Sequence, residues 1–111
     1  MAEVHDCFTP TELVIYEDLG FSERGRAWQE VLDGVFDLDG ELPVNPDGGL
    51  KSFGHPIGAS GLRMLYEMYL QLRGQAGPRQ LNNPRLGLTH NLGGFPWESV
   101  CSVCIVGKEL D

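Results

Sequence analysis

Residues 45–74, NPDGGLKSFGHPIGASGLRMLYEMYLQLRG, join a loop rich in glycine and proline to a strongly periodic segment. In residues 45–58, glycines and prolines recur too often for regular structure, so we expect an irregular loop. From about residue 59, apolar side chains recur at spacings of three and four, which places them on one face of a helix: Leu62, Leu65, Tyr66, Tyr69 and Leu72. We expect this helix over residues 59–73, ending at Gly74 after a basic residue.

His55 lies in the tight turn ahead of this predicted helix. The neighbouring glycines let the backbone approach a ligand closely, and Pro56 restricts the path of the chain. The unpaired N–H groups of a first helical turn favour partial negative charge nearby. A histidine in this place is suited to act as a base or to donate a hydrogen bond to an oxyanion. It is also suited to an ordinary turn without a chemical role, and its surroundings leave both interpretations open.

The first seven residues indicate the end of a β-strand that runs directly into a helix. We expect Thr9 as the N-cap of that helix, with Pro10 at the first position and Glu12 completing a capping box. His5 and Cys7 are two residues apart, so in a strand both side chains point to the same side. Strand-to-helix junctions are common places for chemistry in α/β proteins. The alternative for Cys7 is that of a small buried apolar residue.

The remainder of the chain predicts further local structure and a β-hairpin. Three segments are expected to be, in order, a weak helix, an acidic solvated loop and a turn-rich connection: residues 22–33, 34–49 and 75–84. Residues 86–91 and 100–106 are expected to be antiparallel strands, because the connection between them is too short for a parallel crossover. Gly93 and Gly94 are expected to open the loop between them. The result is an α/β unit with the helix at residues 59–73 packed against the sheet.

The net charge of −8 excludes functions that need a basic surface. Nucleic acids and anionic membranes are bound by clusters of Lys and Arg, so we expect neither as a partner. The chain has no apolar run long enough to span a membrane and no signal-peptide pattern, which favours a cytoplasmic protein. Its three cysteines lack a framework spacing and fit a reducing compartment. Cys101 and Cys104 form a lone C-x-x-C without a second pair, so no metal is expected, and His90 is expected to be structural.

Three motifs occur in an order that resembles the C-terminal part of the thiolase family. GHPIGASG at residues 54–61 follows NPDGG and precedes a helix ending in QLRG, while HDCF and GLTHNLGG lie at residues 5–8 and 87–94. HDCF and HNLGG resemble the sterol-carrier-protein-2 type, which is acetyl-CoA acetyltransferase-like, more than the ordinary degradative or biosynthetic thiolases. The resemblance covers essentially the whole chain. It implies an α/β unit of three strands with packed helices, as one part of a five-layer αβαβα architecture.

The resemblance also implies roles for five residues. His55 would activate the nucleophile and help to bind an oxyanion, and His5 stands where common thiolases carry an asparagine at the first oxyanion hole. Cys7 stands where the sterol-carrier type carries its second acid/base cysteine. Asn91 replaces the cysteine that performs this role in common thiolases, and we expect it to line the site. Gly93 matches the glycine whose backbone N–H lines the second oxyanion hole.

The family's acylated cysteine has no counterpart in this sequence. Residues 1–111 are therefore expected to be a partial thiolase C-terminal domain, without the nucleophile-bearing N-terminal half. The resemblance implies a fragment or subunit that acts on acyl-CoA or 3-ketoacyl-CoA thioesters in a homo- or hetero-oligomer with a chain carrying that half, and that is inactive in isolation. The coenzyme A thioester is the substrate, and no separate cofactor is expected. Two alternatives stay open: a non-catalytic thiolase-fold interaction or scaffold protein, and a thiolase-fold aldolase subunit acting on coenzyme A esters.

Overall fold

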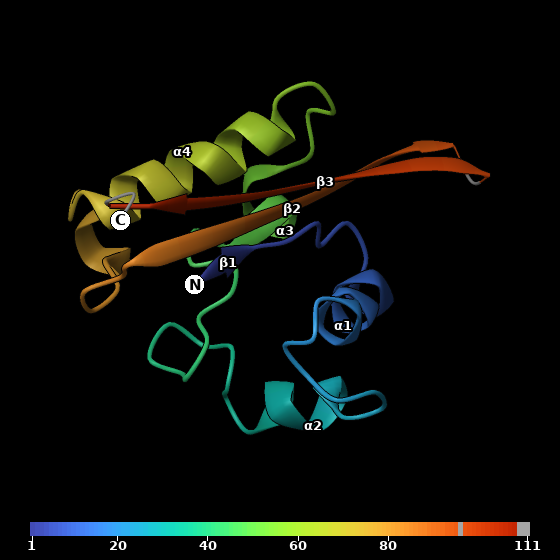
Figure 1. Cartoon of the computed structure of the whole chain (residues 1–111), viewed down its shortest axis with the longest axis horizontal. Helices are drawn as coiled ribbons and strands as arrows, with labels where there is room; N and C mark the ends of the chain where they lie inside the picture. Colours follow the sequence, from blue (N-terminus) through green and yellow to red (C-terminus); the bar gives the residue numbers. More distant parts are fainter. Residues whose placement is uncertain (96, 109–111) are drawn as a thin grey trace.

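The computed structural model describes residues 1–95 and 97–108. Its elements, in chain order, are β1 (Ala2–Glu3), α1 (Thr9–Asp18), α2 (Ala27–Leu32), α3 (Gly49–Phe53), α4 (Ser60–Leu72), the short 3₁₀ helix η1 (Gly77–Arg79), β2 (Leu86–Phe95) and β3 (Glu98–Gly107) (Figure 1). The strands form one sheet in the order β1–β2–β3, in which β2 is parallel to β1 and antiparallel to β3. The prediction of a mixed α/β unit with three strands and packed helices is confirmed.

The β2–β3 hairpin is longer than the sequence predicts. Its pairing is continuous from Leu86 opposite Gly107 to Phe95 opposite Glu98. The expectation that a loop opens at Gly93 and Gly94 is wrong, because both residues pair with β3. Gly94 has a φ of +103°, and a Cβ there would overlap the carbonyl oxygen of Glu98. The glycine therefore lets the two strands stay close at the tip of the hairpin instead of ending them.

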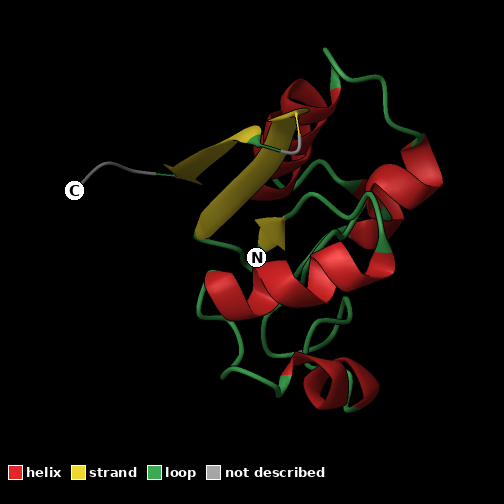
Figure 2. Cartoon of the chain, turned by 90° about the vertical axis from the view of Figure 1, so that its right-hand side faces the viewer, coloured by secondary structure: helices red, strands yellow, loops and turns green. Residues whose placement is uncertain are grey.

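Helices lie on both sides of the sheet. α4 packs against β2 and β1, whereas α1 and α2 lie on the opposite side (Figure 1; Figure 2). The apolar core gathers side chains from β1, α1, α2 and the acidic loop: Ala2, Val4, Ile15, Tyr16, Ala27, Phe36 and Val44. The loop at residues 34–49 is therefore only partly solvated, since Phe36 and Val44 belong to this core and Val44 forms a parallel bridge to Ala2. Within the described part of the chain, every helix is too short or too polar to span a bilayer.

The start of α1 differs from the predicted capping box. Phe8, not Thr9, is the N-cap residue, and no side chain caps the helix. The carboxylate of Glu12 instead accepts hydrogen bonds from three other groups: the Tyr16 hydroxyl at 2.8 Å, Asn45 Nδ2 at 3.2 Å and Lys51 Nζ at 2.7 Å. Because these partners occupy both carboxylate oxygens, the side chain does not turn back to the helix start. The predicted capping box is wrong.

Two further helices depart from the sequence-based boundaries. α2 begins at Ala27 instead of residue 22, after a turn in which Gly25 has a φ of +81°. α3 lies inside the stretch expected to be irregular. Its first N–H groups are satisfied by carboxylates, because Asp47 Oδ1 accepts from Gly49 at 2.8 Å and Asp6 Oδ1 accepts from Leu50 at 2.7 Å. Asp6 is distant in sequence, so the local pattern of glycines gives no indication of this turn of helix.

α4 confirms the helix expected at residues 59–73, but its predicted apolar stripe only partly faces the sheet. Leu65 and Leu72 are half-buried and line a pocket with Val106 of β3, whereas the other three residues of the stripe are exposed. Leu62, Tyr66 and Tyr69 are 68%, 61% and 50% exposed. The buried face is built from other side chains: Ser60, Met64, Glu67, Met68 and Gln71. The apolar spacing thus predicts the helix correctly, but the side of the helix that packs on the sheet carries methionines and polar groups.

Candidate active site

An open cleft of about 720 Å³ lies where the chain after β1, the segment after α3 and the far end of β2 meet. It brings together all five residues that the thiolase resemblance points to: His5, Cys7, His55, Asn91 and Gly93. Further lining comes from Leu50 and Lys51 of α3 and from apolar side chains that include Phe8 and Ile57. These residues lie far apart in the sequence, so the fold itself assembles the cleft.

The side chain of His5 lies in the wall of the cleft and is bound to a side chain of β2. It lies two residues after the end of β1 and is only 4% exposed. Its Nδ1 lies 3.1 Å from Oδ1 of Asn91 on β2. Because an amide oxygen only accepts, Nδ1 carries the proton, and Nε2 is left with the lone pair in the neutral ring. The interaction fixes both the tautomer and the orientation of this imidazole.

His55 is held in the same way by a residue that follows it in the chain. Its Nδ1 lies 2.7 Å from Oγ of Ser60, the first residue of α4. The hydroxyl of Ser60 donates to the carbonyl of Pro56 at 3.2 Å, so its oxygen is free to accept from Nδ1. In the tautomer in which Nδ1 donates to this oxygen, His55 also leaves Nε2 unprotonated when neutral. Unlike His5 it is exposed, and it follows Gly54, which has a φ of +81°.

The two imidazoles lie in contact with each other. Their ring centroids are 4.9 Å apart, and the planes meet at 83° in an edge-to-face arrangement. Cys7 is a half-buried free cysteine that lines the same cleft as His5. The cleft thus contains two ring nitrogens able to accept protons and one thiol able to exchange one.

Two further positions contribute to the cleft: Gly93 through its backbone, and Ser60 through the hydroxyl that binds His55. A Cβ on Gly93 would meet no atom within 4 Å, so the backbone at this point faces open space in the cleft. Ser60 is 1% exposed and was not singled out by the sequence. Ser60 follows His55 by five residues and is the first residue of α4. A serine at the start of a helix, shortly after a histidine, is the sequence signal that could have indicated this hydrogen bond. Lys51, whose half-exposed ammonium group lies at the cleft, is a second residue that the motifs do not indicate.

Three other candidate residues lie outside this cleft. His90 is buried on the other face of β2, and burial lowers its pKa, so it stays neutral near neutral pH. Cys101 and Cys104 are exposed free cysteines, and their spacing of three places them on opposite faces of β3. Within residues 1–95 and 97–108, no group of three or more His, Cys, Asp or Glu side chains is arranged to hold a metal ion.

Comparison with known proteins agrees with the motifs along almost the whole length of the chain. Residues 1–106 match the family described as thiolase C-terminal domain-like. An acetyl-CoA acetyltransferase of Methanothermobacter thermautotrophicus is 49% identical over 94 residues, which cover 85% of this chain and 24% of that protein. Sterol carrier protein 2 of Homo sapiens is 46% identical over 91 residues, or 82% of this chain and 17% of that protein.

The relatives are much longer than this chain. Non-specific lipid-transfer protein-like 2 of Caenorhabditis elegans is 43% identical over 91 residues, covering 82% of this chain and 22% of that protein. The chain thus spans about a quarter or less of the length of the curated relatives it matches. The match over residues 1–106 nevertheless includes every motif and every residue of the cleft, and on this evidence the chain belongs to the thiolase family, as a C-terminal domain.

Proposed function

We propose that this chain supplies acid/base and oxyanion-binding groups for acyl transfer on an acyl-CoA or 3-ketoacyl-CoA thioester. The nucleophilic cysteine of the site would come from outside these 111 residues. The observation that carries the proposal is the pair of histidines in one cleft, each bound through Nδ1 and each with Nε2 free. Two ring nitrogens able to take up a proton, in the same cleft as the Cys7 thiol, are groups that acid/base catalysis requires.

Acyl transfer from a thioester needs a thiolate nucleophile, and His55 is placed to generate it. Nε2 of His55 takes the proton from the incoming cysteine thiol, and the imidazolium then donates a hydrogen bond to the oxyanion of the tetrahedral intermediate. The backbone N–H of Gly93 provides another donor at the cleft, and Nε2 of His5 would donate there once its ring has taken up a proton. With an acyl-CoA, collapse of the intermediate expels the coenzyme A thiolate, which takes the proton back from the His55 imidazolium. With a 3-ketoacyl-CoA, collapse expels the enolate of the shortened thioester, and the Cys7 thiol protonates it at carbon and becomes a thiolate.

Cys7 is assigned the second proton transfer. In thiolysis its thiolate accepts the proton of the incoming coenzyme A thiol, which then attacks the acyl-enzyme. In the condensation direction the same thiolate removes a proton from the α-carbon of the second thioester. Its position beside His5, on the strand extension and inside the cleft, supports this role. Two relatives named acetyl-CoA acetyltransferase, at 49% and 43% identity, support the reaction class.

The outer surface of α4 supports the part of the proposal that concerns a second polypeptide segment. Leu62, Tyr66 and Tyr69 expose at least half of their surface each, along one side of the helix. Such a stripe is characteristic of a helix that is covered on both sides. We propose that the polypeptide that carries the nucleophile covers it, in a homo- or hetero-oligomer or in a longer chain.

The same stripe favours a second candidate, a non-catalytic thiolase-fold protein that uses α4 as a binding surface. The two candidates differ in what they require of the cleft. A scaffold needs the exposed apolar residues and has no use for the free Nε2 atoms of His5 and His55. Substitutions inside the cleft therefore separate the two functions.

The test is a complementation assay for thiolysis of acetoacetyl-CoA. The chain alone should be inactive, and activity should appear when it is mixed with a polypeptide that carries the thiolase nucleophile. His55→Ala should then lower kcat by roughly 10²–10³-fold, because it removes a base and an oxyanion donor together. Leu32→Ala, at a 77% exposed position on α2, is the matched control and should leave kcat unchanged. Equal turnover with and without His55 would reject the catalytic function and leave the scaffold.

A further inference from the structure

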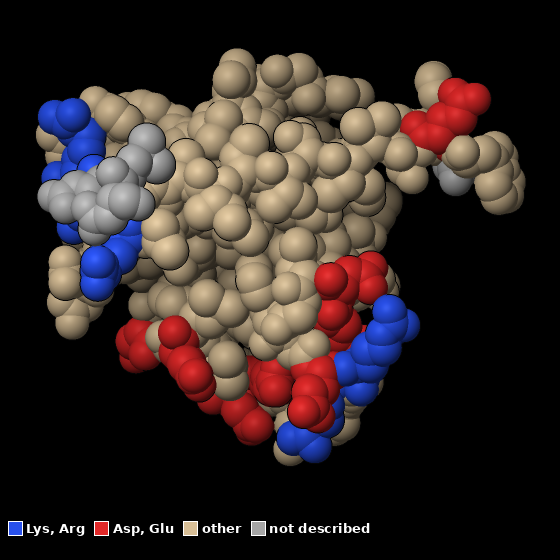
Figure 3. Space-filling view, in the orientation of Figure 1, with Lys and Arg blue, Asp and Glu red and all other residues tan. Residues whose placement is uncertain are grey.

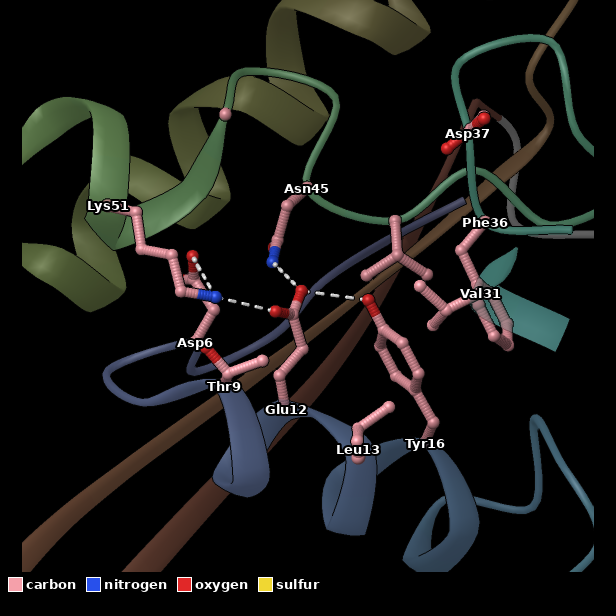
Figure 4. Close-up of a pocket in the computed structure, with 12 residues that line it drawn as sticks. Asp6, Thr9, Glu12, Leu13, Tyr16, Val31, Phe36, Asp37, Asn45 and Lys51 are labelled. Carbon is pink, nitrogen blue, oxygen red and sulfur yellow. Dashed lines mark hydrogen bonds and ion pairs between the residues drawn. The ribbon is translucent and has the colours of Figure 1, made fainter. Parts of the chain in front are cut away.

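Asp6 is a buried carboxylate that lies between two residues of the candidate active site and faces the other way. His5 and Cys7 line the cleft, whereas Asp6 lines a separate cavity of about 300 Å³ between α1 and α3 (Figure 4). The side chain is only 2% exposed. Its neighbours His5 and Cys7 line the cleft but not this cavity, so the carboxylate is directed away from them. The reaction proposed above has no direct use for it.

The carboxylate of Asp6 joins the His5 segment to the segment that leads to His55. Its Oδ1 accepts the backbone N–H of Leu50 at 2.7 Å, in a buried hydrogen bond that spans 44 residues of sequence. Its Oδ2 lies 3.9 Å from the ammonium group of Lys51. Both partners belong to α3, which runs directly into Gly54 and His55. Leu50 and Lys51 also line the cleft itself, so Asp6 connects two of its walls.

A wider set of polar contacts holds the same junction from α1. Lys51 Nζ donates to Glu12 Oε2 at 2.7 Å, and the other oxygen of Glu12 accepts from Tyr16 and Asn45 (Figure 4). Asn45 in turn accepts the backbone N–H of Val4 at 2.8 Å. Asp6 is a buried carboxylate of this set, with only 2% exposure. Its partner at Leu50 is a backbone N–H, so no rotation of a side chain can substitute for the lost hydrogen bond if Asp6 is removed.

The backbone of α3 is shaped to admit the carboxylate. A Cβ on Gly49 would overlap Oδ2 of Asp6, and Gly49 has a φ of +67°. The preceding carboxylate, Asp47, fixes the N–H of Gly49 at 2.8 Å. The close approach of α3 to Asp6 therefore depends on a glycine at this place.

We infer that Asp6 is a positioning residue that sets the distance between the two histidines of the cleft by fastening α3 to the chain after β1. This inference rests on the proposed function for its catalytic consequence, but not for its structural one. The structural consequence is that the edge-to-face contact of His5 and His55, with centroids 4.9 Å apart, depends on the bond from Asp6 to Leu50.

The test uses NMR of the 111-residue chain, with nuclear Overhauser effects between the two imidazole rings as the readout. Asp6→Ala should abolish the inter-ring effects while the cross-strand effects of the β2–β3 hairpin persist. Asp6→Asn keeps an oxygen acceptor for Leu50, so it should restore the inter-ring effects. Asp18→Ala, an exposed aspartate on α1, is the matched control and should change neither.

A second variant tests the inference without leaving a cavity beside Leu50. Gly49→Ala introduces the Cβ that overlaps Asp6 and should also weaken the inter-ring effects. Gly20→Ala is its control, because Gly20 has a similar φ of +72° and open space around it. Inter-ring effects that persist unchanged in Asp6→Ala, or that survive Gly49→Ala with a folded hairpin, would overturn the inference.

The catalytic consequence is measured separately in the complemented thiolysis assay. Displacement of His55 by about 1 Å should lower kcat roughly 10²-fold in Asp6→Ala, with recovery in Asp6→Asn and little change in KM. Absence of activity in the complemented wild type would reject the proposed function and leave the NMR result to decide the role of Asp6. Normal kcat in a variant that has lost the inter-ring effects would overturn the positioning role.

Discussion

At the scale of single residues, Glu3 shows how a charged side chain is accommodated next to the candidate site. It is fully buried, 3.1 Å from a guanidinium nitrogen of Arg63, which also binds Asp47. Burial, followed by the repulsion from Asp47, raises the pKa of Glu3 to about 9, and Arg63 only partly opposes this shift. Near neutral pH Glu3 is therefore protonated, and the ion pair in this cluster is that of Arg63 with Asp47.

The raised pKa of Glu3 predicts a loss of stability as the pH rises. Between the ordinary value of 4.5 and the folded value of about 9, unfolding releases a proton that the folded chain holds. The free energy of unfolding should therefore fall by up to about 1.4 kcal/mol per pH unit across this window. Glu3→Gln has no such proton to lose, so its stability relative to the wild type should increase with pH.

Urea unfolding of both proteins between about pH 5 and pH 8.5 checks this expectation. Glu41→Gln, in the exposed part of the acidic loop, is the control and should follow the wild-type slope. If wild type and Glu3→Gln lost stability in parallel as the pH rose, Glu3 would be ionised in the folded chain and the assignment would be incorrect.

At this scale the motifs predict which residues meet in the cleft, whereas the contacts that hold those residues in place are visible only in the fold. The motifs indicate His5, Cys7 and His55, and the fold places all three in one cleft, although their catalytic roles stay predictions. Ser60 and Asp6 lie inside the motifs, but the resemblance gives them no role, because their significance lies in contacts to His55 and to Leu50. A contact that spans many residues leaves no periodic pattern in the sequence.

At the scale of elements, the packing of α4 on β2 depends on the absence of a side chain. A Cβ on Gly87 would overlap the sulfur of Met68, a fully buried residue of α4. Gly87→Ala should therefore destabilise the chain by about 1–3 kcal/mol, because the flexible methionine must move in a filled interface.

Thermal and urea unfolding of Gly87→Ala measure this cost. Gly58→Ala is the matched control, since a Cβ there would meet no atom within 4 Å. The control should change stability by less than about 0.5 kcal/mol. A Gly87→Ala variant as stable as the wild type would mean that α4 does not lie this close to β2.

The elements themselves were largely predictable, whereas the side that each one covers was not. The period of α4 and the antiparallel hairpin follow from local pattern. The pattern of α4 suggests that Leu62 and Tyr66 form the packed face, but the sheet is covered by Met64, Met68 and Gln71. Gln71 accepts the N–H of Leu81 at 2.9 Å and donates to the carbonyl of Arg79 at 2.9 Å, so its burial is determined by the connection to β2. Such polar burial cannot be inferred from apolar spacing.

At the scale of the whole molecule, charge and apolar surface are segregated. The middle of the face seen in Figure 3 carries almost no charged side chains, and acidic groups gather along its lower edge. Exposed apolar residues occur on α4 and along β3, where Val103 and Ile105 are 49% and 69% exposed. Ten-residue β3 is also an edge strand with one side unpaired. These surfaces are large for a chain that works without a partner.

The exposed stripe predicts that the isolated chain self-associates. Leu62→Glu combined with Tyr66→Glu places two charges on it, and should shift sedimentation velocity profiles toward the monomer at the same concentration. Reducing conditions are needed, because Cys101 and Cys104 are exposed and free. Glu substitutions at Trp28 and Leu32, which are similarly exposed on α2, are the control pair and should leave association unchanged. A monodisperse monomer with a high, cooperative melting transition would contradict the prediction.

The central claim is that one cleft holds two histidines with Nε2 free to take a proton, and the protonation state of each ring nitrogen tests it most directly. Long-range ¹H–¹⁵N correlation spectra of the labelled chain, at a pH where both rings are neutral, report which nitrogen carries hydrogen. The contacts with Asn91 and Ser60 predict hydrogen on Nδ1 and none on Nε2 in both His5 and His55, and Ser60→Ala should alter the pattern of His55 alone. A proton on Nε2 of either ring would contradict the arrangement on which the proposed chemistry rests.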